Sequence, residues 1–231
     1  THGGSPLAGG VAAKAVGLAA AVFALALLCL LSVVVGAKPI AVGTVLDAFL
    51  DFDSRLDDHL IVRDLRVPRT EVGLLAGMAL GLGGAVMQGV ARNPLADPGI
   101  LGVNAGAAFL VVLGIYVFGI ASLYGYVWFA FAGAAAASVA VYGIGSIGRE
   151  GATPVKLSLA GAAITAFLGS LTAAILLLDV GTLDQYRFWA VGSLAGRDAT
   201  IAASVAPFVI VGALGALACG PALNALALGD D

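Results

Sequence analysis

The sequence predicts an all-α fold, a polytopic transmembrane helical bundle, and three observations lead to this class. Residues of the types AVILMFWYC make up 61% of the 231-residue chain, only 11% of the chain is charged, and the mean hydropathy is +1.06. A soluble domain carries about a quarter charged residues. The apolar residues gather into six runs, each close to the roughly 20 residues that a helix needs to cross a bilayer. We therefore predict one transmembrane domain, residues 1–231, with six spans.

The second apolar run, Val72–Ala91, is the centre of the predicted bundle. It contains 20 residues without a charge, and small residues recur at every fourth position: Gly73, Gly77, Gly81, Ala85 and Gly89. On a helix these residues form a nearly bare stripe, along which neighbouring helices can approach closely. We assign this stripe to helix packing. Pro68 suits the first turn of the helix, and Pro94 and Pro98 prevent its continuation.

The remaining elements follow from charge and hydropathy along the chain. Residues 1–10 contain glycine and proline and are expected to be mobile. Apolar residues at helical spacing among acids predict a short amphipathic helix in the loop 39–65, and the aromatic, polar residues 181–198 predict a short interfacial helix. Arg149 to Gly151 is expected to close a tight turn. The other five spans are expected at Ala15–Val35, Ile100–Phe118, Val127–Ile147, Leu157–Leu178 and Ala199–Ala218.

A family resemblance rests on the stretch from Arg66 to Ala107, RVPRTEVGLLAGMALGLGGAVMQGVARNPLADPGILGVNAGA. Later in the chain come KLSLAGAAIT, RFWAVGSLAGR and NALALGD. Together these motifs resemble the permease subunits of iron-siderophore, haem and cobalamin ABC importers, most closely those for ferric-catecholate siderophores. The resemblance covers roughly residues 63–231 and implies the type II ABC importer permease fold. Since that fold has about ten spans, it implies six spans of an expected ten and a C-terminally incomplete domain.

The resemblance also implies a function and a set of partners. The chain would be a multi-pass permease of the cell inner membrane that translocates iron-siderophore complexes and is itself no enzyme. Its partners would be a second permease subunit in a homo- or heterodimer, cytoplasmic ATP-binding subunits, a periplasmic or lipid-anchored substrate-binding protein, and membrane lipid. A net charge of −3 argues against nucleic-acid binding. Two alternatives stay open: a cobalamin or haem permease, and a secondary carrier or channel.

Candidate site residues follow from the same resemblance. Arginines at the RxPR positions, Arg66 and Arg69, would dock acidic residues of the binding protein, although snorkelling toward the interface would also explain them; Arg63 lies outside this motif. The fifth span would line the translocation pathway at the dimer interface, although packing alone would also explain its small residues, and the loop before it would form the inner gate. The pathway residues are Gly161, Thr165, Gly169 and Thr172, and the gate residues are Thr153, Pro154 and Val155.

Several kinds of site have no support in the sequence. No Walker A motif GxxxxGK[ST] is present, so the chain is not expected to be the ATPase, and we assign no catalytic residue and no cofactor. His2 and His59 fall in different segments, and Cys29 and Cys219 sit within apolar runs, so no metal site is predicted. None of the six predicted spans contains Asp or Glu, which argues against a proton-coupled carrier.

Charge alone and the resemblance disagree about orientation. With a cytoplasmic N-terminus, four basic residues would lie inside and seven outside, which is the reverse of the positive-inside rule. The resemblance implies a cytoplasmic N-terminus, and we follow it because the outer arginines would serve docking. This orientation makes both the loop 39–65 and residues 181–198 periplasmic.

Overall fold

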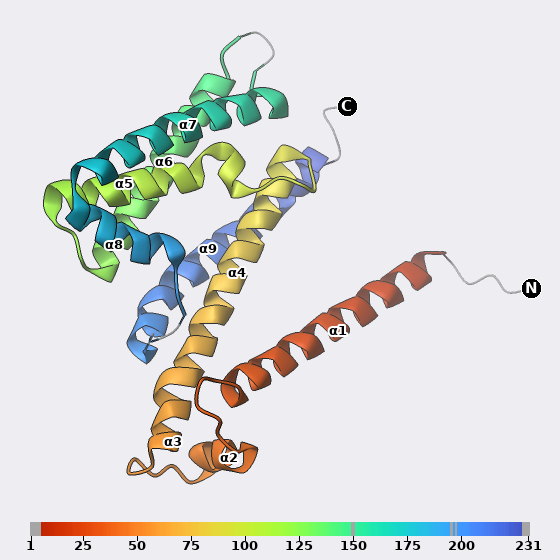
Figure 1. Cartoon of the computed structure of the whole chain (residues 1–231). Coiled ribbons are helices and arrows are strands. Elements are labelled where there is room, and N and C mark those ends of the chain that lie inside the picture. Colours follow the sequence, from red (N-terminus) through yellow and green to blue (C-terminus); the bar gives the residue numbers. More distant parts are fainter. Residues whose placement is uncertain (1–5, 149–150, 195, 197, 228–231) are drawn as a thin grey trace, which may run out of the picture. The chain divides into compact units, whose positions relative to one another are not determined.

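The structure is a computed structural model that describes residues 6–148, 151–194, 196 and 198–227, with side chains described from residue 12 to residue 226 within these ranges. Arg149, Glu150 and Arg197 lie outside the described residues, as do the first five of the ten N-terminal residues expected to be mobile. The described residues form helices and no strand (Figure 1). The prediction of an all-α fold is therefore confirmed.

Eleven helical elements are described. They are α1 (Pro6–Val34), α2 (Val42–Leu50), α3 (Asp57–Leu60), the π-helical η1 (Ile61–Arg66), α4 (Val67–Ala91), the 3-10 helix η2 (Pro98–Leu101), α5 (Val103–Phe118), α6 (Leu123–Gly145), α7 (Pro154–Leu178), α8 (Val180–Val191) and α9 (Ala199–Ala227).

Five described helices are long and apolar enough to cross a membrane, where the sequence predicted six spans. They cover Ala12–Val34, Asp57–Ala91, Leu123–Gly145, Pro154–Leu178 and Ala199–Leu226. The remaining expected span is α5, which has 16 residues. It would reach about 24 Å, against a hydrocarbon core of about 30 Å. Left-handed glycines, Gly102 (φ 67°) and Gly119 (φ 62°), flank this helix and set its short length.

The chain divides into two compact units, which are described separately. Unit 1 comprises residues 1–77 and 194–209, and unit 2 comprises residues 78–193 and 210–231. The boundaries pass through α4 and α9.

In unit 1 the central helix begins earlier than the sequence predicts. Helical structure runs without a break from Asp57 through η1 into α4, so Pro68 lies inside a helix. A proline there removes one backbone donor, and its ring crowds the carbonyl of the residue four positions before it. The π-helical turn accommodates this, because the Val67 N–H bonds to the carbonyl of Val62, five residues back. The long helix therefore begins at Asp57, within the range 39–65 that the sequence analysis assigns to a loop with a helix.

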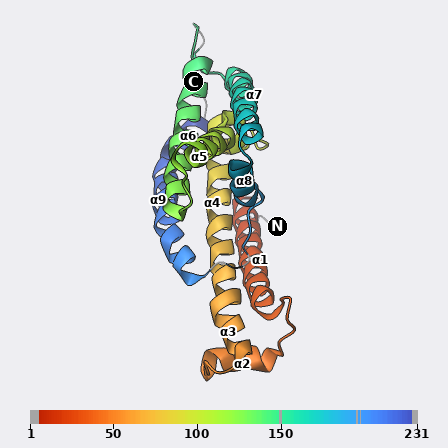
Figure 2. The ribbon, with the colours of Figure 1, turned by 60° about the vertical axis from the view of Figure 1, so that its left-hand side comes forward.

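The core of unit 1 lies between α2 and the start of this long helix. Its buried members are Ile40, Val45, Ala48 and Val62, with Val33, Val34 and Ile61 packed against them. Both views show α2 beside the N-terminal end of α3 (Figures 1 and 2). The amphipathic helix expected in the loop 39–65 is thus represented by α2, and its inner face holds it against η1.

In unit 2, α5, α6 and α7 pack against one another, with η2 and α8 against them (Figure 1). The closest approach joins α5 to α6, because a Cβ added at Gly106 would overlap the carbonyl oxygen of Gly133, and one added at Gly133 would overlap that of Gly106. The short helix expected within residues 181–198 is α8. Asp179 caps it by accepting a hydrogen bond from the Thr182 N–H at 2.7 Å, and its hydrogen bonds to Thr182 lower the pKa of Asp179.

Candidate functional site

Arg66, one of the two predicted docking residues, caps the C-terminal end of α1. Its side chain is buried, with 3% of the residue exposed. Nη1 donates to the carbonyls of Val33 at 3.0 Å and Val34 at 2.5 Å, and Nη2 donates to the carbonyl of Lys38. Carbonyls at a helix C-terminus have no partner within the helix, and a cation suits the partial negative charge there. Arg66 thus joins the end of α1 to the start of α4.

Gly36 makes this cap possible, and the sequence analysis did not single it out. A Cβ added at Gly36 would lie 2.9 Å from Cζ, Nε and Nη2 of Arg66. Real Cβ atoms are not found this close to another heavy atom, and the bonds of Nη1 and Nη2 to three carbonyls hold the guanidinium in this position. The only signal in the sequence is a glycine that follows the first apolar run, which is also the usual position for ending a helix.

Arg69 and Arg63 bind helix ends in the same way. Nη2 of the half-buried Arg69 donates to the carbonyls of Ser32 and, at 3.2 Å, Val35. Arg63 donates from Nε to the Ala48 carbonyl at 2.9 Å and from Nη2 to the Phe49 carbonyl at 3.3 Å, at the end of α2. We call Arg63, Arg66 and Arg69 the arginine clamp, because they tie α1 and α2 to the long helix.

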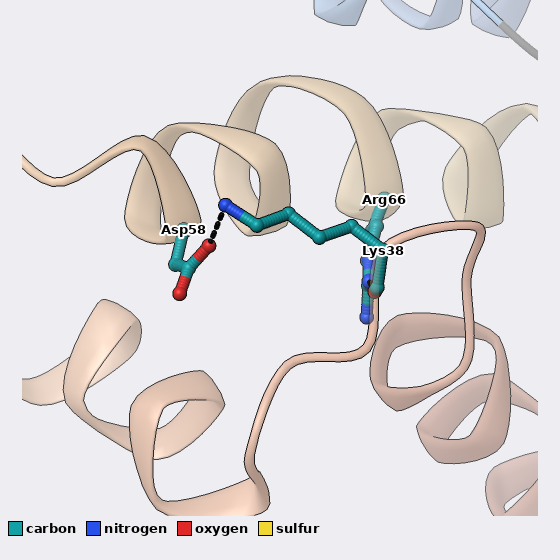
Figure 3. A network of polar contacts seen from close by, with 3 residues as sticks. All are labelled: Lys38, Asp58 and Arg66. Atoms are coloured by element: carbon teal, nitrogen blue, oxygen red, sulfur yellow. Dashed lines mark hydrogen bonds and ion pairs between the residues drawn. The ribbon is translucent and has the colours of Figure 1, made fainter.

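An ion pair lies beside the clamp (Figure 3). Lys38, whose carbonyl accepts from Arg66, places its Nζ 2.6 Å from Oδ1 of Asp58 in α3. The hydrogen bond to the Asp58 carboxylate raises the pKa of Lys38, and the negative charges of Asp58 and Asp57 act in the same direction. Both side chains are partly exposed, so solvent screening leaves this pair a minor contribution to stability. It fixes the position of the segment between α1 and α2.

The four predicted pathway residues of α7 fall into two kinds of surroundings. Gly161 is buried, and a Cβ there would overlap the carbonyl oxygen of Ile100 in η2. Thr172 is also buried, with its hydroxyl donating to the Leu168 carbonyl at 2.8 Å. Thr165 and Gly169 are exposed, and a Cβ at Gly169 would meet nothing within 4 Å. Unit 2 therefore uses two of the four residues for its own packing.

The turn after α4 places η2 against Gly161. Asn93 Oδ1 accepts from the Leu95 N–H at 2.9 Å, and Asp97 Oδ1 accepts from the Gly99 N–H at 2.7 Å. These side chains accept hydrogen bonds from backbone N–H groups of the turn, as is usual for Asn and Asp in turns. The sequence NPLADPG therefore builds a self-contained turn whose side chains fix the direction of η2.

The three predicted gate residues form the start of α7. Thr153 is the N-cap, and its Oγ1 accepts from the Lys156 N–H at 3.4 Å. Pro154 occupies the first helical position, where its missing N–H costs no hydrogen bond. The side chain of Val155 is exposed. These contacts fix where α7 begins and leave one apolar side chain on the surface.

Among the residues that the structure describes, the small-residue stripe of α4 makes close contacts only near its two ends. A Cβ at Gly73 would lie 3.3 Å from Leu194, and one at Gly89 would lie 3.2 Å from Leu223, whereas Cβ atoms at Gly77 and Gly81 would meet nothing within 4 Å. Ala85 is exposed. The assignment of this stripe to helix packing stays a prediction. Gly106, Gly133 and Gly161 lie closer still to the backbone of a neighbouring element.

Among the described residues, no group of three or more His, Cys, Asp and Glu side chains could hold a metal ion. His59, the one histidine within the described ranges, is buried beside α2. Cys29 lies in α1 and Cys219 in α9, and neither forms a disulfide.

Comparisons with known proteins identify similar chains. The model of the FecCD transport family matches residues 24–231. The ferric enterobactin transport system permease protein FepD of Escherichia coli (strain K12) is 50% identical over 202 residues, which cover 87% of this chain and 60% of that protein. The iron(3+)-hydroxamate import system permease protein FhuB of Bacillus subtilis (strain 168) is 41% identical over 214 residues, which cover 90% of this chain and 54% of that protein.

A solved structure has the same fold over most of the chain. It is an inward-facing conformation of a metal-chelate type ABC transporter, with a TM-score of 0.71 and 25% sequence identity. The match covers 89% of this chain and 62% of that one. The chain therefore spans about 60% of the length of a relative such as FepD.

Proposed function

Because the chain belongs to the FecCD transport family, we propose that it is the membrane-spanning permease subunit of an ABC importer that carries ferric siderophore complexes across the inner membrane. The observation that carries this proposal is the similarity over residues 24–231, with 50% identity to a ferric enterobactin permease. In this proposal the chain is a transport subunit and ATP hydrolysis takes place in separate subunits. The membrane-length helices supply the transmembrane part.

The proposed assembly contains a second permease, two cytoplasmic ATP-binding subunits and a substrate-binding protein. The exposed apolar side chains of α7 support the need for a partner or for lipid, since Phe167 is 60% exposed and Leu177 is 86% exposed. In this assembly α7 lies at the contact between the two permeases. A homodimer and a heterodimer meet this requirement equally well.

We propose that Arg69 is the main residue that docks the binding protein. Arg69 is half-buried, and a guanidinium has five donors in a planar fork that matches a carboxylate. A carboxylate of the binding protein can therefore accept hydrogen bonds from Arg69 in addition to the two carbonyls to which Arg69 already donates. Arg66 is buried against three carbonyls, so it can meet a partner only by releasing the end of α1. In this refinement of the docking proposal, Arg66 stabilises the docking surface by holding the end of α1 and does not itself contact the binding protein.

The pathway and the gate are proposed for the surface of α7. Thr165 and Gly169 supply a small, weakly polar wall past which a bulky chelate can move, because neither residue offers it a strong binding group. Gly161 keeps α7 in place through its close contact with η2, and Thr172 is buried with its hydroxyl bonded within α7 itself. Thr153, Pro154 and Val155 form the inner gate at the start of the helix, where the N-cap fixes the position of Val155.

Uptake by cells tests the proposed substrate class. The full-length protein, expressed with its partner subunits in a strain that lacks its own siderophore permeases, is expected to restore uptake of a radiolabelled ferric catecholate. Cells of the same strain that express the partner subunits without this permease serve as the control. Parallel assays use a ferric hydroxamate and cobalamin. Restored uptake of cobalamin with no ferric chelate imported would overturn the proposed substrate class in favour of a cobalamin permease.

A further inference from the structure

His59 is a buried histidine where the connection from α2 enters the long helix. Only 3% of the residue is exposed, and its ring stacks on Phe52, with the centroids 6.2 Å apart and the planes inclined by 28°. Nδ1 accepts a hydrogen bond from the backbone N–H of Asp53 at 3.1 Å. An Nδ1 that accepts carries no proton, so this bond requires the neutral ring with its proton on Nε2. The bond closes the turn formed by residues 51–56.

The ring of His59 is connected to the arginine clamp through Phe52. The guanidinium of Arg63 lies over the other partner of the stack, with its Cζ 4.7 Å from the centroid of the Phe52 ring. Arg63 in turn donates to the carbonyls of Ala48 and Phe49 at the end of α2. His59, Phe52 and Arg63 thus form a continuous set of contacts that holds the C-terminal end of α2 against η1.

The segments that pack around His59 carry charged residues of both signs. The elements packed against α3 are α2 and η1. These two elements, α3 itself and the turn before it carry both carboxylates and basic side chains. The acidic groups are Asp47, Asp51, Asp53, Asp57, Asp58 and Asp64, and the basic groups are Lys38, Arg55, Arg63 and Arg66. Lys38 is paired with Asp58.

We propose that His59 is an acid-sensitive latch for the segment that joins α2 to the long helix. Histidine is the side chain that ordinarily changes its charge between pH 5 and 8. A proton added to Nδ1 turns the acceptor into a donor that faces the N–H of Asp53, so this hydrogen bond is lost. The turn at residues 51–56 then opens, and the support that Phe52 gives Arg63 weakens. The latch depends on these contacts alone and is independent of the proposed transport function.

Hydrogen exchange on the full-length protein in lipid nanodiscs tests the latch. Exchange of peptides covering residues 51–56 is measured at about pH 7.5 and about pH 5.5, on either side of the ordinary histidine transition. Rates are corrected for the pH dependence of intrinsic amide exchange. The protection of this segment is expected to fall about tenfold at the lower pH, as the loss of one buried hydrogen bond predicts. Peptides from α6 are expected to keep their protection.

Two variants separate titration of His59 from a general effect of acid. His59→Asn keeps an acceptor oxygen bonded to Cγ, as Nδ1 is, but cannot take up a proton in this range, so its protection is expected to be independent of pH. His59→Leu has no acceptor and is expected to exchange rapidly at both pH values. Equal pH dependence in the wild type and His59→Asn would overturn the latch, and so would a wild type whose protection does not change with pH.

Discussion

Replacing Arg66 by glutamate is expected to destabilise unit 1 strongly, whereas replacing Arg69, which is half-buried and bonds two carbonyls, is expected to destabilise it less. Arg66 is 3% exposed and donates to three carbonyls, so a carboxylate in its place would face acceptors and leave them without a donor. Hydrogen bonds to a charged group contribute about 1.5–3 kcal/mol each, so the expected loss is roughly 3 kcal/mol or more of the free energy of unfolding. Thermal unfolding of the full-length protein in detergent and hydrogen exchange at residues 31–38 measure it.

Arg66→Lys provides a graded comparison for this prediction. Lysine keeps the charge but lacks the planar fork that reaches several carbonyls at once, so an intermediate loss of stability is expected. Gly36→Ala is expected to act in the same direction, because its added Cβ would displace the guanidinium of Arg66. Wild-type stability and wild-type exchange at the end of α1 in Arg66→Glu would show that the cap does not hold this helix.

The docking part of the prediction concerns Arg69 in the folded protein. Arg69→Glu is expected to weaken binding of the substrate-binding protein to the assembled transporter, because like charges would then face each other. The weakening should be greatest at low salt, since exposed charges are screened over about 10 Å at 0.1 M ionic strength. Affinities in nanodiscs at low and high salt measure this effect. Unchanged affinity of Arg69→Glu under both conditions would leave Arg69 as a helix cap without a docking role.

A second large effect is expected for Gly161→Ala in α7. The added Cβ would overlap the carbonyl oxygen of Ile100, so η2 and the turn before it must move. Overpacking of this kind costs about 1–3 kcal/mol of the free energy of unfolding. Gly169→Ala is the matched control, since it lies on the same helix and its Cβ would meet nothing within 4 Å. Thermal unfolding is expected to occur at a clearly lower temperature in Gly161→Ala alone.

The comparison of these two glycines decides between packing and exposure along α7. If both variants unfold at the wild-type temperature, the close contact between Gly161 and η2 is absent in the protein in solution. If both are destabilised, Gly169 is also packed against other atoms in the protein in solution.

Hydropathy and turn residues were sufficient to predict several elements from the sequence. The expected span Leu157–Leu178 corresponds to α7, Pro154–Leu178, because a long charge-free run between Lys156 and Asp179 leaves little choice of boundary. The turn between α4 and η2 was equally clear, since two prolines and two Asx residues fall within Asn93–Pro98. Such features depend on neighbours in the sequence and need no knowledge of distant contacts.

Other features depend on contacts that a sequence does not display. Pro68 suggested a helix start, but the π-helical turn before it lets the helix continue from Asp57. The sequence predicts that Arg66 is a cation at the surface. In the structure it is buried, because it donates a hydrogen bond to the carbonyl of Val33, which lies 33 residues away in the sequence. Gly161 and Gly169 are both predicted pathway residues, and only the position of η2 shows which of them is packed. The docking and pathway assignments therefore require a test in the assembled protein.

Transport in proteoliposomes tests the proposed function most directly. The full-length protein is reconstituted with its ATP-binding subunits, and the binding protein loaded with a ferric siderophore is supplied on the opposite side of the membrane. The chelate is expected to accumulate only when ATP reaches the ATP-binding subunits, and accumulation is expected to stop when vanadate blocks hydrolysis. Accumulation driven by a proton gradient in the absence of ATP would contradict the proposed ABC importer and identify the chain as part of a secondary carrier.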